Sequence, residues 1–176
     1  MSELSRSERG AAVQAEVGAQ PAPEPRTLLE TAARDFLFAE VWSRLDRRAR
    51  YLISLAASTL NGAAADLLDF YVRGALKSGE LTLAELREAA LHLGGYGNLP
   101  RALVLDKAIS RAEQALGLPP AECPPLSSDP AVLDGRIAAG EAEFMNVMTF
   151  GNTTPPFPFL EAISGHVFGE IWTRPG

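Results

Sequence analysis

A seven-residue phrase occurs twice in the chain and constrains its architecture more than any other feature. It reads FAEVWSR at residues 38–44 and FGEIWTR at residues 168–174, and the two copies contain the only two tryptophans. Aligned at this offset of 130, residues 6–44 and 136–174 share ten identities without a gap, where unrelated segments of ordinary composition share roughly three. We therefore predict that a C-terminal tail repeats the lead segment of residues 6–44.

Helical periodicity runs through most of the chain. Apolar side chains recur at steps of three and four from Leu28 onwards, and Asp46 is a plausible N-cap for the next helix. Thr82 and Glu85 have the spacing of a capping box, which marks a further helix start. No stretch alternates with period two for long enough to require a strand, so the predicted fold is all-α. The expected helices span about residues 28–41, 46–60, 63–77, 82–93, 101–116, 132–147 and 157–172.

Proline and glycine divide the chain into segments. We expect a flexible lead segment at residues 1–27, a helical core at residues 28–118, a proline-rich linker at residues 119–130 and the helical tail at residues 131–176.

Composition excludes several classes of partner. The net charge is −6 and the basic residues are scattered, which argues against nucleic acid. No apolar run approaches the roughly 18 residues of a membrane span, and the N-terminus lacks the apolar region of a secretion signal. The single cysteine, Cys123, can form neither an internal disulfide nor a metal cluster, which fits a reducing compartment. We expect a cytoplasmic protein without a metal or membrane partner.

One expected helix carries a possible catalytic stripe. Glu88, His92 and Tyr96 follow one another at i, i+4 steps and therefore share a helix face. A carboxylate beside an imidazole favours proton transfer, and a tyrosine hydroxyl can donate to an anionic substrate. The alternative is structural, with a packed His92, the Tyr96 ring in the core and a solvated Glu88.

A second cluster is basic. Four arginines lie within seven residues, a residue type suited to holding a carboxylate through paired hydrogen bonds. The alternative is a solvated helix start, balanced by Glu40 and Asp46. The four are Arg44, Arg47, Arg48 and Arg50.

Four motifs in order, in FAEVWSRLDRRARYLISLAASTLNG and YVRGALKSGELTLAELREAALHLGGYGNLPRAL, resemble the carboxymuconolactone decarboxylase family over about residues 34–116. The resemblance implies an alkylhydroperoxidase D-like helical bundle, here with an additional C-terminal helical segment, that assembles into homo-oligomers. The peroxidase branch of the family uses a Cys-x-x-Cys pair before a histidine. Ala64, Leu67 and Tyr71 take those three positions here, so we expect no peroxidase activity.

The remaining branch resembles cofactor-independent lyases that remove carbon dioxide from a small carboxylated lactone or keto acid through an enolate. Alternatives are a biosynthetic tailoring enzyme, that is a cyclase or isomerase, and a non-catalytic helical oligomer. The assembly is expected to be a dimer, trimer or hexamer. The resemblance suggests catalytic roles for His92, Glu88, Tyr96, Tyr71 and Glu40, and substrate-binding roles for Arg48, Arg50 and Trp42.

The tail has one apolar side and should pack on the core of its own or a neighbouring subunit. We expect it to present His166 and Glu170, as further substrate-binding candidates, near the pocket that holds His92. The alternative is that the chain is a fragment of a longer protein with two such units.

Overall fold

A computed structural model describes residues 4–126, 129–149 and 158–174 of the chain. Within these ranges the regular elements are all helices, which confirms the all-α prediction. The helix expected from about residue 157 begins, where described, at Pro158; Phe157 itself lies outside the described residues. None of the described helices is long and apolar enough to cross a membrane.

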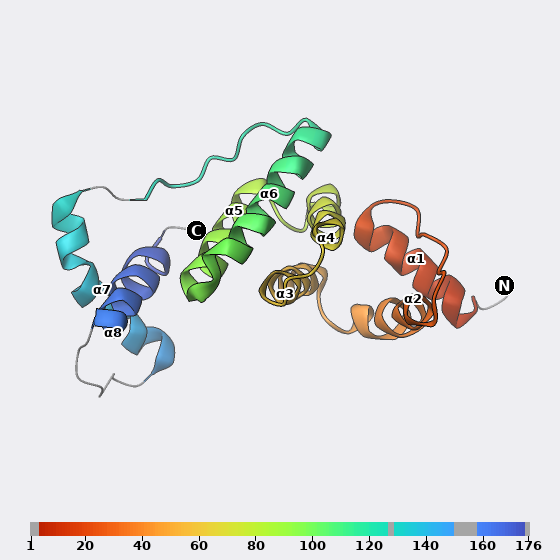
Figure 1. The fold of residues 1–176 in the computed structure, drawn as a ribbon, viewed down its shortest axis with the longest axis horizontal. Coiled ribbons are helices and arrows are strands. Elements are labelled where there is room, and N and C mark those ends of the chain that lie inside the picture. Colours follow the sequence, from red (N-terminus) through yellow and green to blue (C-terminus); the bar gives the residue numbers. More distant parts are fainter. Residues whose placement is uncertain (1–3, 127–128, 150–157, 175–176) are drawn as a thin grey trace.

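Four helices form the central core (Figure 1). They are α3 (Arg47–Leu60), α4 (Ala65–Ser78), α5 (Leu83–Leu93) and α6 (Leu99–Leu116), with the π-helical turn η3 (Gly94–Asn98) joining the last two. Asp46 caps α3 by accepting from the Ala49 N–H at 2.9 Å, and Thr82 and Glu85 form the expected capping box on α5. Val72, Leu86 and Ile109 are fully buried between the helices.

A first helical hairpin covers one side of the core. It consists of α1 (Arg6–Gly18), α2 (Leu28–Ala32) and the π-helix η1 (Ala33–Val41) that continues α2. Residues 6–18 are thus helical within the segment expected to be a flexible lead, because Ser5 and Glu8 form a capping box at the start of α1. Gly10 allows the two arms to touch, since a Cβ there would overlap the Arg34 carbonyl oxygen.

The tail forms a second hairpin, from α7 (Pro130–Met148), α8 (Pro158–Ala162) and the π-helix η4 (Ile163–Ile171). The bounds of α2 and η1, shifted by 130, are the bounds of α8 and η4. Gly140 lies against the Ser164 carbonyl oxygen, which corresponds by this shift to the contact of Gly10 with Arg34. The two hairpins therefore share the boundaries of their second arms and one close backbone approach, whereas α7 begins six residues earlier than α1 does after the same shift.

The hairpins lie at opposite ends of the core, and an extended linker after α6 carries the chain across to α7 (Figure 1). Directly after the first hairpin, Trp42 is buried, stacks on Tyr71 of α4 at 5.7 Å and meets Tyr51 of α3 edge-on at 5.5 Å between ring centroids. In the second, η4 packs on α5 and η3, where Gly95 leaves room for Ile171. The same phrase thus meets two different faces of the core.

Candidate functional site

A polar hollow of about 550 Å³ lies where the second hairpin meets the core. Helix α3 contributes Arg48, and α5 contributes side chains on one helical face. The linker contributes Cys123, and the tail closes the hollow with its aromatic and basic side chains. We refer to this as the polar hollow; its principal lining residues are Arg48, Glu85, Glu88, His92, Cys123, Trp172 and Arg174.

The imidazole of His92 is oriented by its own helix. Its Nδ1 lies 3.0 Å from the Glu88 carbonyl oxygen, which can only accept, so we assign the proton of the neutral ring to Nδ1. This tautomer leaves the Nε2 lone pair available for a proton. Trp172 meets the ring edge-on, with centroids 6.1 Å apart. The Glu88 carbonyl and Trp172 thus fix the orientation of the ring.

Glu88 orients His92 through its backbone, while its carboxylate binds the tail. Arg174 donates to both carboxylate oxygens, from Nε at 2.9 Å and from Nη2 at 2.8 Å, and also donates to the Pro124 carbonyl. These hydrogen bonds lower the pKa of Glu88, against the opposing effect of burial, so its carboxylate is ionised at neutral pH. The Arg174 side chain is only 9% exposed, so the pair is largely shielded from solvent.

Arg48 has hydrogen-bond donors that no described residue uses. Its Nη1 donates to Glu85 at 2.9 Å and to the Glu80 carbonyl at 3.1 Å, and the side chain is 47% exposed. The pKa of Glu85 is lowered first by the Thr82 N–H and then, more weakly, by Arg48. Among the described residues Nε and Nη2 of Arg48 donate no hydrogen bond, so they remain available to an anionic oxygen.

A second hollow, about 220 Å³ in volume, adjoins the first. We refer to it as the apolar hollow. Leucines of α3, α5 and α6 form most of its wall, and Tyr96 stands at its edge with its side chain more than half exposed. His92 and Ala89 line both hollows. The imidazole therefore stands at the boundary between a polar and an apolar compartment. The lining residues of the apolar hollow are Leu52, Leu55, Ala56, Leu86, Ala89, His92, Leu93, Tyr96 and Leu105.

Four of the sequence-derived candidates lie elsewhere. Trp42 and Tyr71 stack in the core, where burial raises the pKa of Tyr71, and Arg50 lies over the Trp42 ring at 5.5 Å. Glu40 pairs with Arg6 at 2.7 Å. None of these lines either hollow. The structure therefore brings together His92, Glu88 and Arg48, with Tyr96 nearby, but not these four.

In the tail, His166 and Glu170 pair with each other at 2.9 Å and line neither hollow. Trp172 and Arg174 line the polar hollow instead. Sequence reasoning did not assign Arg174 or Cys123 to the site. The signal for Arg174 was the arginine that ends the second copy of the phrase.

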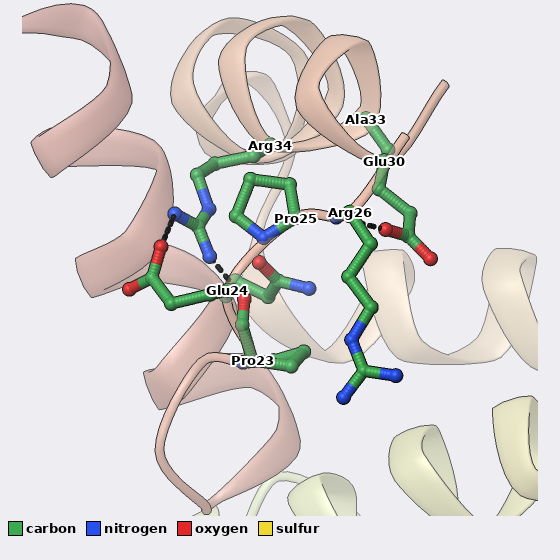
Figure 2. A pocket seen from close by; sticks show the side chains of 8 residues that line it. Pro23, Glu24, Pro25, Arg26, Glu30, Ala33 and Arg34 are labelled. Carbon is green, nitrogen blue, oxygen red and sulfur yellow. Dashed lines mark hydrogen bonds and ion pairs between the residues drawn. The ribbon is translucent and has the colours of Figure 1, made fainter. Parts of the chain in front are cut away.

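A further hollow of about 540 Å³ lies on the first hairpin. Figure 2 shows the Arg34 guanidinium directed at Glu24 and the Pro23 carbonyl, while the Arg26 side chain extends away from both. Glu30 accepts from the backbone N–H groups of Arg26 and Thr27 as part of a helix cap. Glu24, Glu30 and two Arg34 nitrogens bind groups of the hairpin itself, while the buried Arg34 Nε has no hydrogen-bond partner among the described residues. The hollow contains no histidine, so we take the polar hollow as the candidate site.

The fold and the polar hollow define an all-helical protein with an oriented imidazole between its core and a helical hairpin. The model of the carboxymuconolactone decarboxylase family matches residues 28–110, so this part of the chain is similar to that family. The match includes Arg48, Glu88 and His92 but not the tail. The comparisons with curated proteins and with solved structures found no match. In the described residues no cluster of three or more His, Cys, Asp or Glu could hold a metal ion.

Proposed function

We propose that the polar hollow is the active site of a cofactor-independent carboxy-lyase acting on a small carboxylated lactone or keto acid through an enolate. One observation supports this most directly. The hydrogen bond from His92 Nδ1 to the Glu88 carbonyl orients the ring with Nε2 available. The match of residues 28–110 to the carboxymuconolactone decarboxylase family and the spare donors of Arg48 are consistent with such chemistry.

In the proposed reaction, Arg48 binds an anionic oxygen of the substrate and stabilises the charge that develops there. The bond between the carboxyl carbon and the adjacent carbon breaks, the carboxylate leaves as carbon dioxide, and the electron pair becomes the enolate. His92, protonated at Nε2, delivers that proton to carbon and regains one from water. No external oxidant or reductant is needed, because the bond electrons stay with the enolate.

Charged and aromatic groups surround the imidazole. The ionised Glu88 lies close enough to His92 for their charges to interact. Arg174 fixes the Glu88 carboxylate, and Trp172 covers the edge of the imidazole. The tail thus supplies a wall of the proposed site, and Arg174 acts as a positioning residue.

The test follows proton NMR signals of a panel of carboxylated lactones and β-keto acids in deuterated buffer. We expect loss of carbon dioxide with deuterium uptake by the wild-type protein, and a rate about 10²- to 10⁴-fold lower in His92→Ala. His166→Ala is the matched control, because His166 is the only other histidine and lines neither hollow. Equal rates in His92→Ala and His166→Ala would remove His92 from the chemistry.

The same spectra distinguish the alternative functions. A cyclase or isomerase on this fold would exchange protons without losing carbon dioxide, again with a His92 requirement. A non-catalytic helical oligomer would leave every substrate unchanged at stoichiometric protein concentration.

A further inference from the structure

The apolar hollow has no role in the proton transfer just described, yet it opens beside the residue proposed to perform it. Leu52 and Leu55 come from α3, Leu93 from α5 and Leu105 from α6, so three core helices build its wall. Leu55 and Leu105 are almost fully buried. Part of the wall of the hollow therefore belongs to the buried core.

The size of the hollow matches a substituent. Apolar cavities of about 150 Å³ stay dry and accept a benzene ring. The volume here is about 220 Å³, which allows a phenyl ring or a short branched alkyl group. Small-molecule sites typically combine such an apolar wall with a few placed polar groups. His92 supplies the placed polar group at the common boundary.

We propose that the substrate is amphiphilic, with its acid or keto end beside His92 in the polar hollow and an apolar substituent of about phenyl size in the apolar hollow. The inference rests on the proposed function, because it places the reacting end at His92. The observation that carries it is that His92 and Ala89 line both hollows. A substituent anchored among the leucines holds the reacting carbon at the imidazole.

The first test measures binding without turnover, by calorimetry with two unreactive carboxylates. Wild-type protein should bind 4-phenylbutanoate at least about tenfold more tightly than butanoate, because burial of an aromatic ring is worth that factor or more. Ala56→Phe fills the hollow and should abolish the preference. Ala57→Phe adds the same ring at a neighbouring exposed position that does not line the hollow, and should keep it.

Equal affinities for the two ligands, or loss of the preference in both variants, would overturn the proposal. A second measurement does not depend on variant folding: intermolecular NOEs should connect the phenyl protons to methyl groups of Leu52 and Leu93 in the wild-type protein. NOEs to other methyl groups alone would also overturn it. A third result would overturn it as well: Ala56→Phe dissociates an oligomer, and the wild-type protein shows no preference for the phenyl ligand. The apolar hollow would then be filled by a second copy of the chain.

The outcome is separable from that of the proposed function. His92-dependent exchange without a phenyl preference leaves the lyase in place and rejects the amphiphilic substrate. The other outcome is a phenyl preference with no deuterium exchange into any keto acid, whether aryl-substituted or short. It rejects the enolate chemistry, and the bound ligand is then not an analogue of a substrate.

Discussion

Arg174 binds Glu88 through two hydrogen bonds, of 2.9 and 2.8 Å, and joins two residues that are 86 positions apart in the chain. The pair lies on a wall of the polar hollow and links the tail to α5. Because Arg174 is largely buried, loss of its partner leaves a poorly solvated charge.

Charge reversal should therefore detach the tail. We expect Arg174→Glu to destabilise the docked hairpin by about 2 kcal/mol, the usual cost of losing hydrogen bonds between charged groups. The double variant Glu88→Arg with Arg174→Glu should recover part of this loss. Hydrogen exchange of α5 and η4 measures the docking. Equal protection in all variants would show that the pair does not hold the tail.

Mixing the two single variants reports whether the tail docks in cis or in trans. If tails dock in trans, the substituted positions of the two variants face each other with opposite charges. The unchanged Glu88 of one variant then also faces the unchanged Arg174 of the other. We expect the mixture to remain as unprotected as its components, because the structure docks the tail on its own core. Recovery of protection on mixing would establish exchange of tails between copies.

Acid should weaken the same contact. The pKa of Glu88 is lowered below its ordinary value of about 4.5 in the folded protein. A lowered carboxyl pKa contributes stability above the unfolded value, and that contribution is lost as the pH falls through the folded pKa. We therefore expect the wild-type free energy of unfolding to fall more steeply than that of Glu88→Gln below about pH 4.5. Denaturant titrations at pH 3 to 7 measure the difference; parallel curves would contradict it.

Two glycines of α7 provide a test of the second hairpin. A Cβ at Gly140 would overlap the Ser164 backbone, so Gly140→Ala should cost about 1–3 kcal/mol. A Cβ at Gly135 meets nothing within 4 Å, so Gly135→Ala should be stabilising by up to about 1 kcal/mol through helix propensity. Proteolytic susceptibility of the tail measures both. The same response to both substitutions would argue against close packing of α7 on η4.

Cys123 offers a direct report of occupancy. It is the only cysteine and lines the polar hollow, with partial exposure. A carboxylate ligand bound beside His92 should slow alkylation of Cys123 by iodoacetamide, whereas Arg174→Glu should accelerate it by opening the hollow. Mass spectrometry of the intact protein follows the single modification. An alkylation rate independent of both would place ligand binding elsewhere.

Homo-oligomerisation is a further prediction. The neighbouring helices α3 and α6 expose Ile53 and Leu103, each at least half accessible, and exposed apolar side chains of this size are typical of subunit contacts. Ile53→Glu and Leu103→Glu should lower the association state in analytical ultracentrifugation. Lys107→Glu, one turn after Leu103 on α6 and also exposed, is the charge control. An unchanged state in both apolar variants would leave these faces outside any interface.

Local signals in the sequence identified most of the fold. The Thr82 capping box, the Asp46 N-cap and the helix end near residue 116 all occur as predicted, because each depends on residues within one helical turn. The helix of residues 6–18 was not predicted, although its Ser5 and Glu8 cap is a signal of the same kind.

The site was less predictable because it depends on contacts distant in sequence. Helical spacing placed Glu88 and His92 on one face, yet it could not show that the Glu88 backbone contacts the imidazole while its carboxylate binds Arg174. The family motifs suggested that Tyr71 and His92 belong to the same site. In the structure Tyr71 instead stacks on Trp42 and lies in the core. Side-chain direction across helices is set by tertiary packing, which periodicity does not encode.

Trp42 and Trp172 occupy the same position in the two copies of the phrase, but their surroundings differ. Trp42 lies among aromatic rings in the interior, so its replacement is opposed through folding itself. Trp172 stands beside His92 at the wall of a hollow, so its replacement reshapes what the protein can accommodate. The same position in two matching hairpins thus belongs to the core in one copy and borders the candidate site in the other.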